Sequence, residues 1–241
     1  MELPKAKVKA SRKSPKNMII YGPPKIGKTI VLSQLDEGPH DPHIFKAIFL
    51  SGGPGSGKSY VARQILQGYG LKFVNSDDMY EYLANKNDLD MSDPSQIISK
   101  QGQEIRGKAK DITNNKKGSH LRGRLGMVID GTGKNLNTVS KQVIGLRAIG
   151  YDCMMVMVNT DLDVAQERNA KRARRVPTEL VTQMWNKVQS NLMKFQQVFG
   201  ASNFHIVDNS GGLEDPDRKE NFLNVEKAVR NFLTKKPTHR A

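Results

Sequence analysis

One eight-residue segment constrains the fold of this chain more than any other feature. It runs Gly52, Gly53, Pro54, Gly55, Ser56, Gly57, Lys58 and Ser59. An apolar run at residues 47–50 leads into it, and residues 60–66 continue with the composition of a helix. Glycines allow backbone N–H groups to converge on phosphate oxygens, and the start of a helix adds partial positive charge. The segment therefore predicts a strand, a phosphate-binding loop and a helix, in that order.

The loop also predicts a binding site for ATP with Mg²⁺. Lys58 is expected to reach the β- and γ-phosphates, and the hydroxyl of Ser59 is expected to ligate Mg²⁺. Tyr60, the next residue, completes the expected set of nucleotide contacts. A glycine-rich turn that matches the pattern by chance is the alternative, but the flanking strand and helix together favour phosphate binding.

The rest of the chain alternates short apolar runs with helical stretches. Strands are expected at residues 45–50, 72–74, 127–129, 153–158 and 204–207. Helix-like segments are expected at residues 60–67, over a long polar stretch from roughly 78 to 124, and at 139–149, 162–172, 178–199 and 224–233. This alternation predicts a three-layer α/β fold with a mainly parallel five-stranded sheet and a helical insertion. The carboxyl ends of the strands then share one edge, where ligands bind.

Carboxylates are expected at that edge. Asp77 and Asp78 follow the second strand, and a carboxylate there can orient a hydroxyl and accept its proton. Helix capping is the alternative role for either residue. Asp130 ends the third strand and is expected to hold Mg²⁺ through a water molecule. Thr132, in the turn that follows, is a possible contact for the acceptor or for a phosphate, or an ordinary turn residue.

A run of arginines follows the fourth strand. Arg168 and Arg172 are four positions apart and would share one face of a helix. A guanidinium that closes over a transferring phosphoryl group stabilises its negative charge, so this run is a candidate lid. Arg172 is the favoured lid residue, although the pattern does not separate it fully from Arg168, Arg174 and Arg175. A solvated basic face or a nucleic-acid anchor is the alternative.

These motifs together resemble the branch of P-loop kinases, within the AAA/P-loop NTPase superfamily, that includes phage polynucleotide 5′-kinases and zeta-toxin-like kinases. The resemblance covers roughly residues 44–210. It rests on the loop at 52–59, on Asn75-Ser76-Asp77-Asp78, on Asp130-Gly131-Thr132, and on Arg168-Asn169 with Arg172 ahead of Val176-Pro177. In the polynucleotide kinases the Asn-x-Asp-Asp run supplies the general base, which implies Asp77. An Arg-Asn-x-x-Arg run supplies the lid arginine, which implies Arg172.

Two departures from the polynucleotide kinases bear on the acceptor. Where those enzymes place an arginine shortly after the acidic pair to hold the substrate phosphate, this chain has Met79, Tyr80 and Glu81. The polar stretch 82–124 is also longer than expected. Asp208-Asn209, at the end of the last strand, occupies a place where related kinases often contact adenine, but a loop cap explains the pair equally well.

Residues 22–29 are a second match to the phosphate-loop pattern. Lys28 and Lys58 are only thirty positions apart, so the first loop has no room for a sheet of its own. Residues 1–37 resemble the truncated start of phage RecA-like ATPases, and a remnant is favoured over a second working site. We expect three regions: residues 1–43, a basic arm with this fragment; residues 44–234, the kinase-like domain; and residues 235–241, a flexible tail.

The formal net charge of +14 indicates polyanionic partners, among which nucleic acid is the first candidate. A solvated basic tail is an equal alternative for the N-terminal part of that charge. The only cysteine, Cys153, lies in an apolar run and is expected to be a buried hydrophobe, which excludes an internal disulfide framework. No apolar run is long enough to cross a bilayer, and a cytoplasmic location is expected, that of the host if the protein is phage-encoded.

Three functions follow from the sequence. The first is an ATP-dependent kinase that phosphorylates a hydroxyl, most plausibly the 5′-OH of a nucleic acid. The second is a kinase of a small molecule or a nucleotide sugar, as the zeta-toxin resemblance implies. The third is a DNA-associated ATPase in phage recombination, prompted by the N-terminal fragment and the charge.

Overall fold

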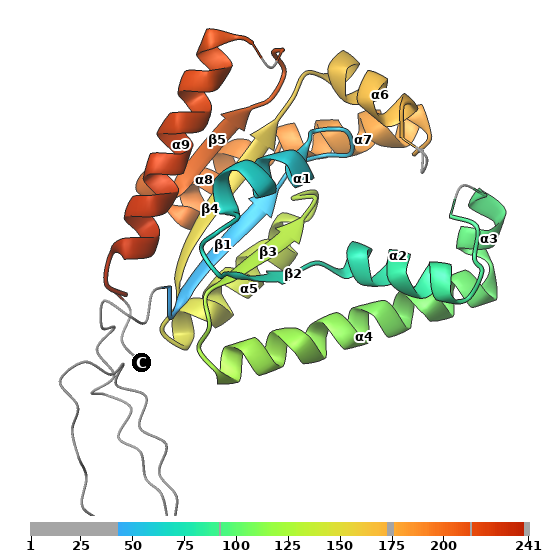
Figure 1. Cartoon of the computed structure of the whole chain (residues 1–241), viewed down its shortest axis with the longest axis horizontal. Coiled ribbons are helices and arrows are strands. Elements are labelled where there is room, and N and C mark those ends of the chain that lie inside the picture. Colours follow the sequence, from blue (N-terminus) through green and yellow to red (C-terminus); the bar gives the residue numbers. More distant parts are fainter. Residues whose placement is uncertain (1–42, 92, 173–175, 213, 239–241) are drawn as a thin grey trace, which may run out of the picture. The chain divides into compact units, whose positions relative to one another are not determined.

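The computed structural model describes residues 43–91, 93–172, 176–212 and 214–238 (Figure 1). Its centre is one sheet of five strands in the order β2-β3-β1-β4-β5. The strands are β1 (Lys46–Ser51), β2 (Lys72–Val74), β3 (Met127–Gly131), β4 (Asp152–Asn159) and β5 (Phe204–Asp208). Every pairing is parallel. The predicted five-stranded parallel sheet is confirmed, with every strand end within two residues of the expected one.

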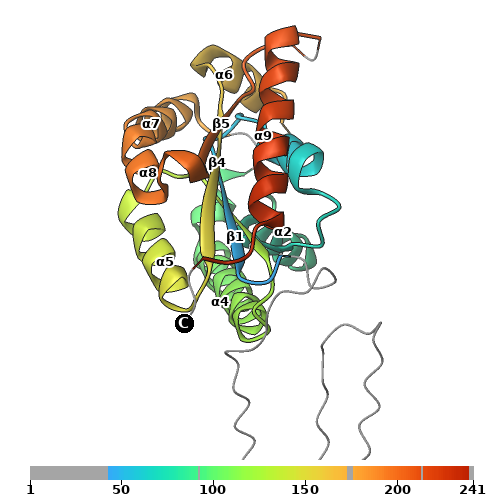
Figure 2. The same cartoon turned by 90° about the vertical axis from the view of Figure 1, so that its left-hand side faces the viewer.

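Helices cover both faces of the sheet, so the predicted three-layer fold is also confirmed (Figure 2). On one face lie α1 (Lys58–Val61), a π-helical turn η2 (Ala62–Leu66) and α9 (Pro216–Thr234). On the other face lie α5 (Leu136–Ala148), α7 (Thr178–Gln189) and α8 (Leu192–Phe199). The central strands β1 and β4 are buried on both sides, which is why their sequences are apolar runs rather than alternating patterns.

A helical hairpin extends from the edge strand β2 (Figure 1). It consists of α2 (Ser76–Lys86), α3 (Pro94–Ile98) and the long α4 (Lys100–Arg122), with α2 packed along α4. A small core of its own stabilises it, formed by Tyr80, Ala84, Leu89, Ile105 and Ala109. The expected helical insertion is therefore an arm attached beside the carboxyl edge of the sheet.

Two helices differ from the prediction. The stretch 178–199 is not one helix, because the chain breaks around Asn191, whose side chain donates to the carbonyl oxygens of Gly133 and Lys134 at 3.0 and 3.3 Å. The last helix, α9, begins at Pro216 rather than near residue 224. The carboxylate of Asp215 caps it by accepting from the amide of Asp217, and a proline in the first turn fixes its start.

Cys153 is buried in β4, and burial raises the pKa of its thiol to about 12, so it packs as a small hydrophobe, as predicted. No helix in the described part of the chain is long and apolar enough to span a membrane. The second phosphate-loop pattern at 22–29, the N-terminal arm, Arg174 and Arg175, and the last residues of the tail lie outside the described residues.

Candidate active site

The phosphate loop connects β1 to α1 at the carboxyl edge of the sheet. Gly55 and Gly57 have φ angles of 79° and 84°, in the left-handed region that favours glycine. A side chain at Gly55 would overlap the carbonyl oxygen of Ala165 on α6 (Leu162–Ala170), and one at Gly57 would overlap the amide of Asn209. The loop is thus pressed between α6 and the end of β5, with space for a ligand only on its open side.

Lys58 points back across this loop. Its ammonium group donates to the carbonyl oxygen of Gly52 at 2.9 Å. Burial lowers the pKa of Lys58, the carboxylates of Asp130 and Asp77 raise it, and the guanidinium of Arg172 lowers it. Asp130, which the sequence assigned to the metal, and Asp77 and Arg172, which it assigned to catalysis, therefore lie within electrostatic range of Lys58. Ser59 is exposed at the start of α1, where its hydroxyl can reach a bound ion.

Asn75 ties the two acidic strand ends together. Its amide nitrogen donates to Asp78 Oδ1 at 2.9 Å and to Asp130 Oδ2 at 3.1 Å. Its carbonyl oxygen accepts from the amide of Asp77 at 2.8 Å and so caps α2. Capping is therefore the work of Asn75, and the exposed carboxylate of Asp77 is available at the open edge. Burial, with the charges of Asp77 and Glu81, raises the pKa of Asp78, and the hydrogen bond from Asn75 lowers it.

Asp130 has the environment expected of a metal-supporting carboxylate. Burial raises its pKa to about 6; Lys58 opposes this rise, and Asp78 and Asp77 add to it. Its Oδ1 atom is buried and makes no hydrogen bond to a described residue. A buried carboxylate oxygen without a partner fits a metal-bound water that would donate to it. Within the described ranges no group of three or more His, Cys, Asp or Glu side chains could hold a metal ion by itself.

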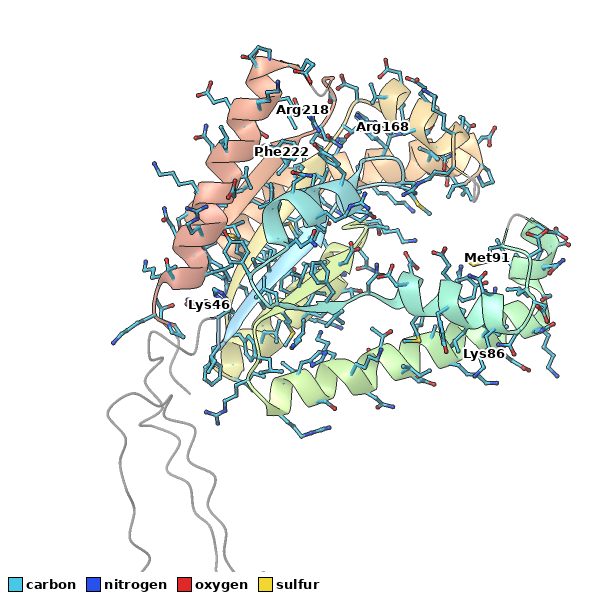
Figure 3. All side chains as sticks on the ribbon, viewed as in Figure 1. Lys46, Lys86, Met91, Arg168, Arg218 and Phe222 are labelled. Carbon is cyan, nitrogen blue, oxygen red and sulfur yellow. The ribbon has the colours of Figure 1, made fainter. Side chains whose placement is uncertain are left out.

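Asn209 joins the loop to the end of β5. Its amide nitrogen donates to the carbonyl oxygen of Ser56 at 2.7 Å, and Thr160 donates to the same oxygen at 3.1 Å. Its own Oδ1 accepts from Arg218 Nε and Nη2 at 3.1 and 2.9 Å. Arg218 is 7% exposed and lies against the rings of Tyr60 and Phe222 (Figure 3). The sequence left Asn209 open between a nucleotide contact and a loop cap, and its contacts make it a support of the loop.

Tyr60 packs away from the loop's open side. Its amide donates to the carbonyl oxygen of Gly57 at 2.9 Å, and its ring lies beside Arg218. Contact between Tyr60 and a nucleotide stays a prediction.

The two described arginines of the candidate lid differ in their contacts. Arg168, on α6, donates from Nη1 to the backbone oxygen of Asn209 at 2.8 Å, and burial lowers its pKa (Figure 3). Arg172, just beyond α6, is exposed and acts electrostatically on Lys58. The side chain of Asn169 closes the turn that precedes Pro177. Its oxygen accepts from the amide of Val176 at 3.1 Å, and its nitrogen donates to the carbonyl oxygen of Val176 at 2.7 Å. Arg168 is therefore held against the end of β5, whereas Arg172 lies within electrostatic range of Lys58, and the lid role of Arg172 stays a prediction.

Sequence reasoning missed several residues of this edge. Arg218 and Thr160 belong to no motif, and their roles depend on contacts with the distant residues Tyr60 and Ser56. A cavity of about 190 Å³ also opens beside Asp130 and Thr132, lined by residues of the turn after β3 and of α5.

Comparison with known proteins supports this architecture. A family model described as an AAA domain matches residues 48–195, more than half of the chain. No curated protein matches it significantly. A putative kinase from Chloroflexus aurantiacus is similar with a TM-score of 0.53 and 13% identity, over 79% of this chain and 100% of that one. The AvrRxo1-ORF1:ORF2 complex solved with ATP is similar with a TM-score of 0.53 and 16% identity, over 68% of this chain and 55% of that one. The chain therefore spans about half the length of that second protein, and identities this low show the fold alone.

Proposed function

The chain belongs to the AAA-domain family and has the fold of a P-loop kinase, and on that premise we propose that it transfers the γ-phosphate of ATP to a hydroxyl, the 5′-OH of a nucleic acid. One observation carries the proposal. The amide of Asn75 bonds both Asp78 and Asp130 and so holds the acidic ends of β2 and β3 together beside the phosphate loop, where Asp130, Asp77 and Arg172 act electrostatically on Lys58. A cation for the phosphates, a carboxylate for the hydroxyl and a guanidinium for the developing charge are the parts that phosphoryl transfer needs.

In the proposed reaction, Lys58 leaves the carbonyl oxygen of Gly52 and binds the β- and γ-phosphates. Asp77 accepts the proton of the acceptor hydroxyl, whose oxygen forms a bond to the γ-phosphorus. The bond from that phosphorus to the β–γ bridging oxygen breaks, and ADP leaves. Arg172 neutralises charge on the equatorial oxygens. Mg²⁺, with Ser59 as ligand and Asp130 behind a bound water, would supply further charge neutralisation.

The helical arm supports nucleic acid as the acceptor. Helix α4 carries seven lysines and arginines against two carboxylates: Lys100, Arg106, Lys108, Lys110, Lys116, Lys117 and Arg122 against Glu104 and Asp111. Five of the seven are exposed along the helix (Lys100, Lys108, Lys110, Lys116 and Arg122). A basic helix beside the catalytic edge can follow a phosphate backbone whose end lies at Asp77.

A small-molecule acceptor is the second candidate, and one observation favours it. Where the polynucleotide kinases have their substrate-binding arginine, this chain has Met79, Tyr80 and Glu81, of which Tyr80 is 2% exposed and packs into the core of the hairpin. That position therefore offers no cation to a nucleic-acid phosphate. A nucleotide sugar or another metabolite would not require one there.

The test offers γ-labelled ATP and Mg²⁺ with 5′-OH DNA, 5′-OH RNA and nucleotide sugars in parallel. The proposal predicts label on the oligonucleotide end, abolished in Lys58→Ala and reduced strongly in Asp77→Asn. Lys28→Ala, in the upstream loop, should retain activity. Label on a nucleotide sugar alone would establish the second candidate. ATP hydrolysis stimulated by DNA, with no labelled acceptor, would overturn both and favour a DNA-associated ATPase.

A further inference from the structure

The cavity beside Asp130 has an apolar wall and a polar rim. It lies between the carboxyl ends of β1 and β3 and the first turns of α5, with a volume of about 190 Å³. Its wall consists of Phe49, Ile129, Val139 and Met155. Phe49 and Met155 are almost fully buried, so the wall is part of the sheet's own core and is held rigidly.

The rim is built from one face of α5 and the turn before it. Asn135, Thr138, Val139 and Gln142 are spaced by three and four residues, so they share the helix face that lines the cavity. The side-chain oxygen of Asn135 is used as the helix cap, where it accepts from the amide of Thr138 at 3.1 Å. The side-chain amide of Gln142 makes no hydrogen bond to any residue that the structure describes, although it is half-buried. The side-chain amide of Gln142 thus offers a donor and an acceptor to a ligand at the rim.

The size and chemistry of the cavity favour a single planar ring system. Its volume is below the roughly 300–1,000 Å³ of pockets that take drug-sized ligands, so a complete nucleotide does not fit inside. A flat ring can lie against the apolar side chains of Val139 and Ile129, and the Gln142 amide can pair with a ring edge that carries both a donor and an acceptor. Nucleobases have this combination of apolar faces and polar edges.

We propose that this cavity binds the terminal nucleobase of the acceptor, the one on the sugar whose hydroxyl is phosphorylated. The inference rests on the proposed function and adds a specificity site to it. The cavity reaches Asp130, which shares the amide of Asn75 with Asp78, so a base held here keeps its sugar near Asp77. Lys134, exposed at the rim, is placed for the phosphate on the 3′ side of that sugar. Lys134 would thus supply the positive charge that Met79, Tyr80 and Glu81 do not offer to the substrate phosphate.

The test is equilibrium binding in the presence of ADP and Mg²⁺, with 5′-OH oligonucleotides labelled at the 3′ end. One oligonucleotide has an ordinary first nucleotide and the other an abasic first nucleotide. Wild-type protein should bind the ordinary end about tenfold more tightly, as expected for one well-packed base. Gln142→Leu, which keeps volume but removes the amide, and Val139→Phe, which fills the cavity, should bring the ratio close to one. Lys141→Ala, an exposed neighbour on α5, should retain the tenfold ratio.

ADP affinity and the melting temperature of each variant show whether it is folded. Equal binding of both ends by the wild type, a preserved ratio in the folded Gln142→Leu protein, or no oligonucleotide binding at all would overturn the inference. If phosphate were transferred at the same rate to the ordinary and the abasic end, the cavity would not bind the base, but the proposed kinase activity would be supported. If the protein bound the ordinary end more tightly than the abasic end but transferred no phosphate, base binding by the cavity would be supported and the proposed kinase function would be wrong.

Discussion

The side-chain amide of Asn209, at the end of β5, donates to the carbonyl oxygen of Ser56 in the phosphate loop at 2.7 Å. The same side chain accepts two hydrogen bonds from the buried Arg218. The strand farthest from the acidic edge is thereby connected to the loop that binds phosphate. A loop whose amides must converge on one anion depends on such support, because small displacements weaken each contact.

Replacement of Asn209 should therefore affect both stability and nucleotide binding. Asn209→Ala removes the donor to Ser56 and leaves the Arg218 guanidinium buried with fewer acceptors, which should cost about 3 kcal/mol of unfolding free energy. Affinity for ADP should fall about tenfold, the equivalent of one good hydrogen bond. Urea denaturation and calorimetric titration with ADP measure the two effects.

Asn209→Asp separates these effects. It retains an acceptor for Arg218 but has no donor for Ser56, so it should preserve most of the stability and still bind ADP weakly. Asn221→Ala, which removes an exposed link to the amide of Asp208, is the matched control and should bind ADP normally. ADP affinity unchanged in Asn209→Asp would show that the loop does not depend on this hydrogen bond.

Asp77 and Asp78 offer a matched pair of carboxylates for the general base. Asp77→Asn should lower kcat by about 10²–10⁴-fold, because proton transfer from the hydroxyl loses its acceptor, with little change in the KM for ATP. Asp78→Asn should have a smaller effect, since Asp78 is already engaged by Asn75. Steady-state kinetics on the labelled acceptor measure both variants. The reverse order of effects would move the general base to Asp78.

The lid assignment predicts a similar contrast between adjacent residues. Arg172→Ala should lower kcat by about 10³-fold, as expected when a guanidinium is withdrawn from the transferring phosphoryl group. Lys171→Ala should leave kcat unchanged, because Lys171 is exposed and pairs with Glu167 on its own helix. Single-turnover kinetics with saturating ATP distinguish loss of chemistry from loss of binding. If Arg168→Ala alone reduced the chemical step, the lid role would belong to Arg168.

The raised pKa of Asp130 makes a prediction about stability and pH. Its pKa is about 6 in the folded protein and near 3.9 in an unfolded chain, so the native state retains a proton that the unfolded state releases between these values. Stability is therefore highest below about pH 4 and falls as the pH rises through 6, by up to about 3 kcal/mol. Asp130→Asn removes this penalty. In EDTA it should stabilise the protein by up to about 3 kcal/mol at pH 8 and by about half as much at pH 5.

Thermal or urea denaturation at the two pH values tests this, with Asp111→Asn on the exposed side of α4 as a control that should show neither effect. A stabilisation that is equal at pH 5 and pH 8 would mean that Asp130 does not titrate in this range. The stabilised variant should nevertheless be a poor enzyme, because its neutral amide no longer attracts the water of a bound Mg²⁺.

The parts of this structure that the sequence predicted are those set by local chemistry. Apolar runs marked all five strands, and the glycines of the loop marked its turn, because both signals are present in the local sequence itself. The break at Asn191 was missed because its cause is a bond to Gly133, 58 positions away. The hydrogen bond by which Asn209 supports the phosphate loop could not be predicted either, since its partner Ser56 is 153 positions away. The start of α9 differs in kind, because Asp215-Pro216 is itself a local signal for the start of a helix, although the predicted helix began at residue 224.

A buried ion pair at the opposite edge of the sheet gives a last prediction, independent of nucleotide chemistry. Lys46 is fully buried, its ammonium lies 2.9 Å from Asp152 Oδ2, and Thr238 also donates to that carboxylate. Lys46→Met should destabilise the protein by about 3–5 kcal/mol, because it leaves Asp152 without its counter-charge in a largely buried position. The double variant Lys46→Met/Asp152→Leu should recover most of that loss, since apolar side chains avoid the cost of desolvating two charges.

Lys219→Met, which removes the exposed pair with Glu214, should change the urea midpoint little. A double variant as unstable as Lys46→Met would show that the cost lies in packing around Lys46, including its contact with the Phe232 ring, and not in the unpaired carboxylate.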